Sequence, residues 1–324
     1  MRRLLVLASL GAALAAPASA QTADITGVGN FSHIVADMDR ALRFYRDVIG
    51  LEPANSAPWS PNPAIMKLGN TPGAQSRFQA LRVPGSDMGV ELIEYKDIER
   101  RVQAPKFSDP GAANFAFRVR DLAPILAKLP GTGATVITEG GKPTVLGNNQ
   151  FIFLQDPDGF VVELIAGPAP ADSKVPATSN VYGGAFEMTV ADAERTATFY
   201  RTLLGIAMSP VGAWNDNQQM ASTAGAPGAH FRQSRATIPG SSTVFTLIEF
   251  RNVPRTPLTG RVQDPGTPIL QVRVRDVDAL TKKLRAAGVP VITEGGVPVE
   301  IRPGLKIVLV KDPDNLILEF MQAG

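Results

Sequence analysis

One pattern of residues occurs twice along this chain, and the second copy follows the first at a fixed distance. Asp37 matches Asp192, which lies 155 positions further on (192 − 37). The tetrapeptide TEGG at 138–141 recurs at 293–296 with the same offset. Self-similarity over this length indicates two copies of one folding unit.

The offset changes by one only near the end of each copy, where DPDG at 156–159 matches DPDN at 312–315. We therefore predict two domains of similar size, 25–166 and 181–322. The stretch between them, 167–180, is rich in Pro, Ala and Ser, as a linker is.

Each copy is predicted to contain two rounds of one order: a strand, a helix and further strands. In the first round, residues 30–35 alternate in polarity as a strand does. Asp37 is a good N-cap for the next helix, which Gly50 ends. Strands at 77–83 and 89–95 flank a Pro-Gly turn and form a hairpin.

The second round opens with a strand at 114–119, followed by a helix that Asp121 caps. The second copy repeats this order with Asp192 and Asp276 as caps. The strands that close the first copy lie near 135–137, 150–154 and 160–165. The order predicts an α+β fold in which paired βαβββ units form a curved sheet around a cleft.

The composition of the chain limits the classes of partner that it can bind. The chain has a net charge of +2 and no sustained basic stripe, which argues against nucleic acid, and 44% hydrophobic residues, which fits a globular protein. A small-molecule partner is the expectation. Both a monomer and a homodimer are compatible with two internal copies.

Residues 1–20 have the features of a secretory signal peptide: Arg2 and Arg3, an apolar run, and Ala-Ser-Ala at 18–20. The apolar run is too short to span a bilayer, so no membrane association is expected after cleavage. The chain has no cysteine, so the fold has to be held by its core. We expect a periplasmic or secreted protein.

Several segments of the first copy together resemble the vicinal oxygen chelate superfamily. They read VADMDRALRFYRDVIGLEP at 35–53, VRDL at 119–122, ITEGG at 137–141 and DPDGFVVELI at 156–165. That superfamily includes glyoxalase I, extradiol dioxygenases, methylmalonyl-CoA epimerase and the fosfomycin- and bleomycin-resistance proteins. The resemblance implies two tandem glyoxalase-like domains, but one scaffold hosts many reactions.

The resemblance also implies a divalent metal held by side chains from four strands of a cleft. In the first copy the corresponding positions are Asn30, Glu91, Asn114 and Glu163. In the second copy they are Ala185, Thr246, Ile269 and Glu319, which leaves one carboxylate. The resemblance thus places the working cleft in the first copy. Its all-oxygen donors suit Mg²⁺, Mn²⁺ or Ca²⁺ better than zinc or iron.

Two interpretations of these four side chains stay open. In one, they hold a metal, and Glu163 or Glu91 is a metal ligand or general base. In the other, the pocket is metal-free, Asn30 and Asn114 bond an organic ligand directly, and the glutamates only make hydrogen bonds. Glu319 would then be structural, or paired with an arginine such as Arg273.

We expect aromatic and arginine side chains to line the rim of each cleft, where they would suit a flat or anionic ligand. In the first copy these are Trp59, Arg77 and Phe78, and in the second Trp214, Phe231 and Arg232. Ordinary loop anchoring is the alternative for each of them.

His33 is one of two histidines, and by strand parity it lies with Phe31 and Val35 on the face that packs against the helix. We therefore expect a core histidine, although a bulge in this strand would turn it into the cleft. His230 is expected in a loop or at a strand edge.

Together these features predict a protein that binds a small organic molecule, and two functions remain. One is a metal-dependent lyase or isomerase of the glyoxalase kind, and the alternative is a metal-free sequestering protein of the bleomycin-resistance kind. Extradiol cleavage is disfavoured because the second copy keeps only Glu319, and glyoxalase I activity because amides stand at the histidine positions.

Overall fold

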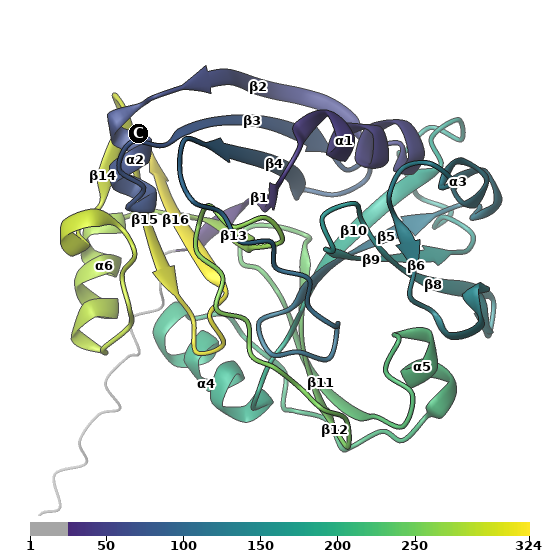
Figure 1. Cartoon of the computed structure of the whole chain (residues 1–324). Coiled ribbons are helices and arrows are strands. Elements are labelled where there is room, and N and C mark those ends of the chain that lie inside the picture. The colour runs from purple at the N-terminus through teal and green to yellow at the C-terminus, as the bar shows by residue number, and fades with distance from the viewer. Residues whose placement is uncertain (1–24) are drawn as a thin grey trace, which may run out of the picture.

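The computed structural model describes residues 25–324, which form two curved sheets with helices packed around them (Figure 1). The predicted signal peptide at 1–20 and its cleavage site lie outside the described residues. No helix within 25–324 is long and apolar enough to cross a membrane.

The first half contains nine strands. They are β1 (Ile25–Val35), β2 (Glu52–Ser60), β3 (Gln75–Arg82), β4 (Gly89–Lys96), β5 (Ala113–Val119), β6 (Thr135–Val136), β7 (Thr144–Leu146), β8 (Asn149–Gln155) and β9 (Val161–Ala166). Its helices are α1 (Met38–Leu42), which continues as a π-helical segment (Arg43–Ile49), α2 (Pro63–Gly69), α3 (Ala123–Lys128) and a 3-10 turn (Glu139–Gly141).

The second half repeats this order with fewer strands. They are β10 (Val181–Thr189), β11 (His230–Thr237), β12 (Val244–Arg251), β13 (Pro268–Val274), β14 (Val299–Arg302), β15 (Leu305–Lys311) and β16 (Ile317–Ala323). Its helices are α4 (Ala193–Leu204), α5 (Gln218–Thr223), α6 (Val277–Ala286) and a 3-10 turn (Glu294–Gly296).

The helix ends lie where the sequence predicts them. The Asp37 carboxylate accepts a hydrogen bond from the Arg40 amide at 2.9 Å, and Asp192 and Asp276 cap α4 and α6 in the same way. Gly50 ends the first helix with φ of 95°, a left-handed conformation that glycine adopts without steric cost. These local predictions are confirmed.

The pairing of the sheets differs from the expectation that each copy closes its own sheet. The first sheet, sheet A, has the order β14-β15-β16-β13-β1-β4-β3-β2, and the second, sheet B, has β11-β12-β10-β5-β9-β8-β6, with β7 paired to β8. Each sheet therefore takes one βαβββ unit from each half, joined through β1 with β13 and through β10 with β5. Because the units are near-equivalent, the sequence pattern does not say which unit pairs with which.

The core lies where the central strands of the two sheets meet. The Phe31 ring of β1 contacts Phe115 of β5 with centroids 4.8 Å apart and Phe186 of β10 with centroids 3.8 Å apart, and all three side chains are fully buried. Aromatic side chains bury large apolar areas, so this cluster fixes the two sheets against each other. The opposite face of each sheet is left to form a cleft.

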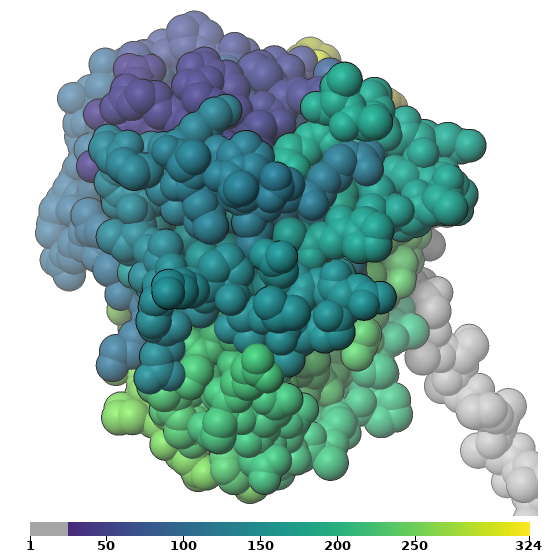
Figure 2. Space-filling view, turned by 90° about the vertical axis from the view of Figure 1, so that its right-hand side faces the viewer, coloured from purple at the N-terminus to yellow at the C-terminus, as the bar shows by residue number. Residues whose placement is uncertain are grey.

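The helices α2 and α5 were not predicted, and each lies against strands of one sheet that belong partly or wholly to the other half of the chain. Asn62 and Asn217 cap them, each with its side-chain oxygen accepting from a backbone amide. Helix α2 contacts β14 and β15 of sheet A, and α5 contacts β8 and β11 of sheet B. In the space-filling view the first half, purple to teal, and the green part of the second half adjoin along one continuous surface (Figure 2).

Candidate functional site

The four residues predicted to form one site lie in two different clefts. We call cleft A the open face of sheet A that carries Glu91, and cleft B the open face of sheet B that carries Glu163. Asn30 and Glu91 belong to cleft A, whereas Asn114 and Glu163 belong to cleft B. The predicted four-residue metal site is therefore not assembled, because the two units of the first half pair with units of the second half instead of with each other.

Cleft A is closed by one side chain, Gln271 of β13. Its amide nitrogen donates to Ser32 Oγ at 3.1 Å and to Glu91 Oε2 at 2.7 Å. Its Oε1 accepts from the backbone N–H of Asn30 at 2.9 Å. Ser32 Oγ also donates to Glu91 at 2.8 Å. The polar groups of this cleft are thus satisfied internally.

Glu319 completes the interior of cleft A. Burial and the nearby Glu91 carboxylate raise the pKa of Glu319 to about 8, and burial raises the pKa of Glu91 as well. The neighbours that affect the pKa of Glu319 are Glu91 and Gln271, so of its two predicted roles the structural one is favoured over a pairing with Arg273. Around this network Ile34, Leu68 of α2 and Ile269 pack as a buried apolar cluster.

Cleft B differs because Ala116 stands where cleft A has Gln271, 155 positions later in the sequence. A cavity of about 190 Å³ lies on this face of sheet B. Five phenylalanines line it, together with two glutamates and a few further residues: Phe107, Phe151, Phe153, Phe231, Phe250, Glu163, Glu187, Gln233, Ile165, Ile248, Met220 and Ala224. Both halves of the chain contribute to this wall.

The two glutamates of cleft B interact with each other. Burial, and then the charge of Glu187, raise the pKa of Glu163 well above its usual range. Burial raises the pKa of Glu187 to about 7, although the neighbouring Asn114 side chain favours its charged form. Two carboxylates this close in an apolar wall share one negative charge more readily than they carry two.

Asn114 lies directly opposite Glu187 on the adjacent strand β5. Its side chain is fully buried, and apart from this neighbour its amide nitrogen and oxygen have no hydrogen-bond partner within residues 25–324. An unsatisfied buried amide costs free energy, so a ligand that bonds it would gain affinity.

Sequence reasoning missed Glu187. The resemblance pointed to Ala185 as the ligand position of this strand, and Glu187 lies two residues further along on the same face. The available signal was its counterpart in the other copy, Ser32, because the exchange of a hydroxyl for a carboxylate at matched positions marks a difference between the two clefts.

Arg77 and Trp59 do not line cleft A, which corrects their expected role at its rim. Arg77 is paired with Glu94 across β3 and β4, and Glu94 accepts from the Met38 amide at the start of α1. Adjacent residues point to opposite faces of a strand, so Arg77 lies on the helix-covered face, away from Glu91. Its guanidinium covers the Trp59 ring at 5.0 Å.

The same arrangement recurs in the second half, where Arg232 bonds Glu249 at 2.8 Å and covers the Trp214 ring at 4.7 Å. Phe231, one residue earlier, points to the opposite face and does line cleft B, as expected. His230 is the first residue of β11, the edge strand of sheet B, as predicted.

His33 is a core histidine, as predicted from strand parity. It is fully buried, its Nε2 lies 2.8 Å from Asp156 Oδ2, and its ring contacts Phe160 with centroids 4.5 Å apart. Asp156 also accepts from the Tyr45 hydroxyl at 2.9 Å. These contacts fix the DPDG turn against the first helix.

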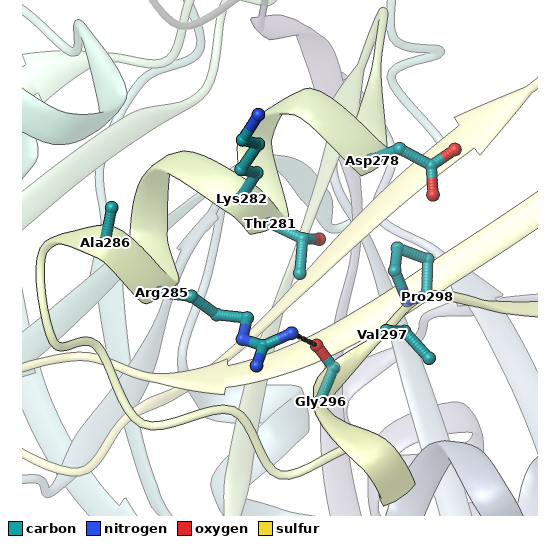
Figure 3. A pocket seen from close by; sticks show the side chains of 8 residues that line it. All are labelled: Asp278, Thr281, Lys282, Arg285, Ala286, Gly296, Val297 and Pro298. Atoms are coloured by element: carbon teal, nitrogen blue, oxygen red, sulfur yellow. Dashed lines mark hydrogen bonds between the residues drawn. The ribbon is translucent and has the colours of Figure 1, made fainter.

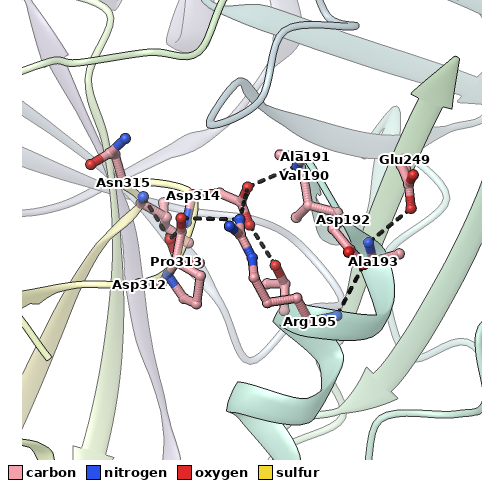
Figure 4. Close-up of polar contacts among 12 residues, drawn as sticks. Val190, Ala191, Asp192, Ala193, Arg195, Glu249, Asp312, Pro313, Asp314 and Asn315 are labelled. Atoms are coloured by element: carbon pink, nitrogen blue, oxygen red, sulfur yellow. Dashed lines mark hydrogen bonds and ion pairs between the residues drawn. The ribbon is translucent and has the colours of Figure 1, made fainter. Parts of the chain in front are cut away.

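Within residues 25–324, His33, Asp156 and Asp158 are the group of acidic and histidine ligand atoms close enough to hold a metal. Most of those atoms already have partners, and the Arg40 guanidinium lies 2.6 Å from Asp158 Oδ1, where it would repel a cation. The second half has the same network around Asp314 without a histidine (Figure 4). The shared network indicates a structural role.

Another depression of about 500 Å³ lies between α6 and the 3-10 turn Glu294–Gly296 (Figure 3). Arg285 donates to the Gly296 carbonyl there, at 3.3 Å. It is open and carries charges of both signs, so it does not compare with cleft B as a binding site.

Comparison with known families agrees with this architecture. The Glyoxalase/Bleomycin resistance protein/Dioxygenase superfamily matches residues 27–164 and 184–320, and the chain belongs to this superfamily. The predicted family and its α+β fold of two tandem glyoxalase-like domains are confirmed.

Individual relatives are more distant. A 2-epi-5-epi-valiolone epimerase from Actinomyces sp. is 30% identical over 149 residues, which cover 44% of this chain and 81% of that protein. Glyoxalase I from Zea mays has a similar structure, with a TM-score of 0.59 and 18% identity over 93% of this chain and 92% of that one. A putative dioxygenase from Bacillus subtilis has a TM-score of 0.58 and 14% identity over 93% and 86% of the two chains. At these identities the structures show a shared fold.

Proposed function

We propose that this protein binds a small organic carbonyl compound in cleft B and moves a proton within it, as an isomerase or epimerase does. The observation that carries the proposal is the pair Glu163 and Glu187, held together in a phenylalanine-lined cavity. Paired carboxylates whose pKa values are raised toward neutrality can serve as acid and base at the same pH.

In the proposed reaction the ionised carboxylate takes the proton from the carbon next to the carbonyl group. The protonated carboxylic acid donates its proton to the carbonyl oxygen, which gives an enol. The enol then returns its hydroxyl proton to the carboxylate that gave it, and a proton is added to the opposite face of the same carbon, which gives the epimer, or to the other carbon of the enol system, which gives an isomer, with no net gain or loss of atoms. Asn114, directly opposite Glu187, would position an oxygen of the substrate.

The relative named an epimerase supports this choice within the lyase and isomerase class predicted from the sequence. The structural similarity to glyoxalase I concerns the fold and does not extend to its substrate.

The test is proton exchange. Small carbonyl compounds incubated with the protein in D₂O should gain deuterium next to the carbonyl group, as measured by NMR, and Glu163→Gln and Glu187→Gln should each reduce the rate at least 100-fold. Glu319→Gln is the matched control, since Glu319 has the position of Glu163 in the filled cleft A and its loss should leave exchange unchanged. Exchange that persists in the Glu163→Gln variant refutes the mechanism.

A sequestering protein is the second candidate, and the five phenylalanines of the cavity favour it. It would bind an aromatic compound without changing it. A compound that raises the melting temperature, but is recovered unaltered and without deuterium after long incubation, would support sequestration over isomerisation.

A divalent cation is a separate proposal. The superfamily resemblance implies one, but the implied positions in cleft B are Asn114, Glu163, Ala185 and Thr246, which supply one carboxylate and no imidazole. This donor set does not fit a zinc or iron site. If the protein uses a metal, its oxygen donors would take Mg²⁺, Mn²⁺ or Ca²⁺, and elemental analysis of protein purified from medium supplemented with these ions tests this.

We further propose a periplasmic or secreted location, based on the signal-like residues 1–20. Detection of the processed chain in a periplasmic or culture fraction, with its new N-terminus after Ala20, checks it. Light scattering would distinguish the monomer from the homodimer.

A further inference from the structure

Two arginines lie on the face of sheet B that forms cleft B. Arg118 of β5 is paired with Ile165, which lines the cavity, and is four residues from Asn114 on the same face. Arg235 of β11 is two residues from the lining residue Gln233 and also points to this face. The register places Arg235 level with Glu187 and Asn114, and Arg118 lies four residues further along β5, so both side chains lie on the open face of sheet B beside the cavity.

Both guanidinium groups are exposed, and within residues 25–324 neither makes an ion pair or a hydrogen bond with a carboxylate. They still act on the glutamate pair over a distance. The charge of Arg118 lowers the pKa of Glu163, and the charge of Arg235 lowers that of Glu187, each against the larger effect of burial. The border of cleft B thus has two cations with free donors.

Cleft A differs from cleft B at two of these positions. The position that matches Arg118 is Arg273, but the position that matches Arg235 is Ala80 and the position that matches Glu187 is Ser32. Cleft A has a carboxylate pair of its own, Glu91 and Glu319, so the second arginine, Arg235, distinguishes the border of cleft B. Packing of the sheet does not require Arg235, since cleft A is built with an alanine at this place.

We infer that the ligand of cleft B is a small organic acid with an aromatic or alicyclic body, whose anionic group is bound by Arg118 and Arg235. This inference rests on the proposed binding function of cleft B and adds the class of substrate. The ring would occupy the phenylalanine-lined cavity, which at about 190 Å³ suits a single ring. Arginine donates paired hydrogen bonds to a carboxylate, and two arginines next to a glutamate pair that shares a proton leave a net positive site.

The experiment compares an acid with its uncharged isostere. We would measure binding of 3-phenylpropionate and 3-phenylpropanamide by calorimetry to the wild type, to Arg118→Gln, to Arg235→Gln and to the double variant. Arg302→Gln, an exposed arginine of sheet A, is the matched control. The wild type and the control should prefer the acid about tenfold or more, each single variant should lose much of this preference, and the double variant should bind the two probes about equally.

Three results would overturn the inference: equal binding of acid and amide by the wild type, a preference that persists in the double variant, or no binding of either probe at millimolar concentration. The readout is separate from the proposed proton transfer. If Glu163→Gln keeps the preference for the acid while the wild type shows no deuterium exchange, the substrate class stands and the reaction falls. If exchange occurs with neutral carbonyl compounds alone, the reaction stands and the substrate class falls.

Discussion

Replacing His33 by methionine would give Asp156 the surroundings that Asp312 has in the second half. Both aspartates are buried and accept from a tyrosine hydroxyl, Tyr45 or Tyr200, at 2.9 Å. In the first strand Met188 has the place of His33, and in the helix Thr196, which donates to Asp314, has the place of Ala41. Asp312 therefore serves as a reference for the state of Asp156 in the His33→Met variant.

The magnitude follows from the two carboxylates. The charge and hydrogen bond of His33 overcome burial and lower the pKa of Asp156 below 3.8, whereas without a histidine burial and the charge of Asp314 raise that of Asp312 to about 7. Three pKa units correspond to about 4 kcal/mol. We expect His33→Met to cost this much at neutral pH, similar to the loss of one partner of other buried ion pairs.

The pH dependence has a definite sign. In the variant, Asp156 would have a folded-state pKa near 7 and an unfolded one near 3.8, so the folded state binds the extra proton between these values. Stability of the variant relative to the wild type should fall as pH rises, with a cost of about 0.5 kcal/mol at pH 4 and about 3 kcal/mol at pH 6.

Urea unfolding at a series of pH values measures this slope, and a cost that is constant between pH 4 and 6 would refute the reasoning. The converse variant, Met188→His, gives Asp312 a cationic neighbour. It should stabilise the protein at pH 6 relative to pH 4, which separates the electrostatic effect from a general loss of packing.

Two further predictions concern the clefts. Ala116→Gln places in cleft B the side chain that closes cleft A. The variant should keep its fold but lose the ligand-induced rise in melting temperature. Unchanged ligand affinity would contradict the assignment of the cavity as the binding site. Glu319, with a pKa of about 8 against an ordinary 4.5, makes the wild type lose stability as pH rises from 4.5 to 8. The stability of Glu319→Gln relative to the wild type should therefore rise by about 1.4 kcal/mol for each pH unit in this window. Urea unfolding of both proteins measures this difference in stability. A difference that does not change with pH would count against a buried, protonated Glu319.

Features that depend on neighbouring residues were predictable from the sequence. The cap at Asp37, the left-handed stop at Gly50 and the buried position of His33 each depend on a few residues and on strand parity, and all three are confirmed. The repeat also predicted the order of the βαβββ units, because the same pattern of periodicity occurs four times.

The pairing of units was not predictable from such patterns, since it depends on contacts between distant segments. Phe31 and Phe186 are 155 positions apart and yet have their rings in contact at the center of the molecule. Once β1 pairs with β13 instead of with β5, Glu91 and Glu163 must lie in different sheets. Glu163 lines the cavity together with Glu187, and Glu91 accepts from Gln271, and both of these partners belong to the other half.

The misplacement of Arg77 has a different cause. A hairpin prediction fixes two strands but not the face on which each side chain lies, and a shift of one residue reverses every side chain. A signal was present in the repeat, because Arg77 and Glu94 recur together as Arg232 and Glu249. Pairs that recur together in both clefts, one filled and one hollow, indicate structure, whereas differences such as Arg235 against Ala80 indicate function.

The two clefts show how one repeated unit can acquire two roles within a chain. In cleft A, Gln271 bonds Ser32 and Glu91, so the polar groups around Glu91 are paired within the protein. In cleft B, Ala116 supplies no such side chain, and the buried Asn114 amide has no neighbour to bond besides Glu187. The Glu163 carboxylate faces the cavity with a raised pKa. Buried polar groups with an incomplete set of partners are typical of a site that binds a ligand. For this reason cleft B, and not the cleft with the better hydrogen-bonded network, is the one to which we assign a function.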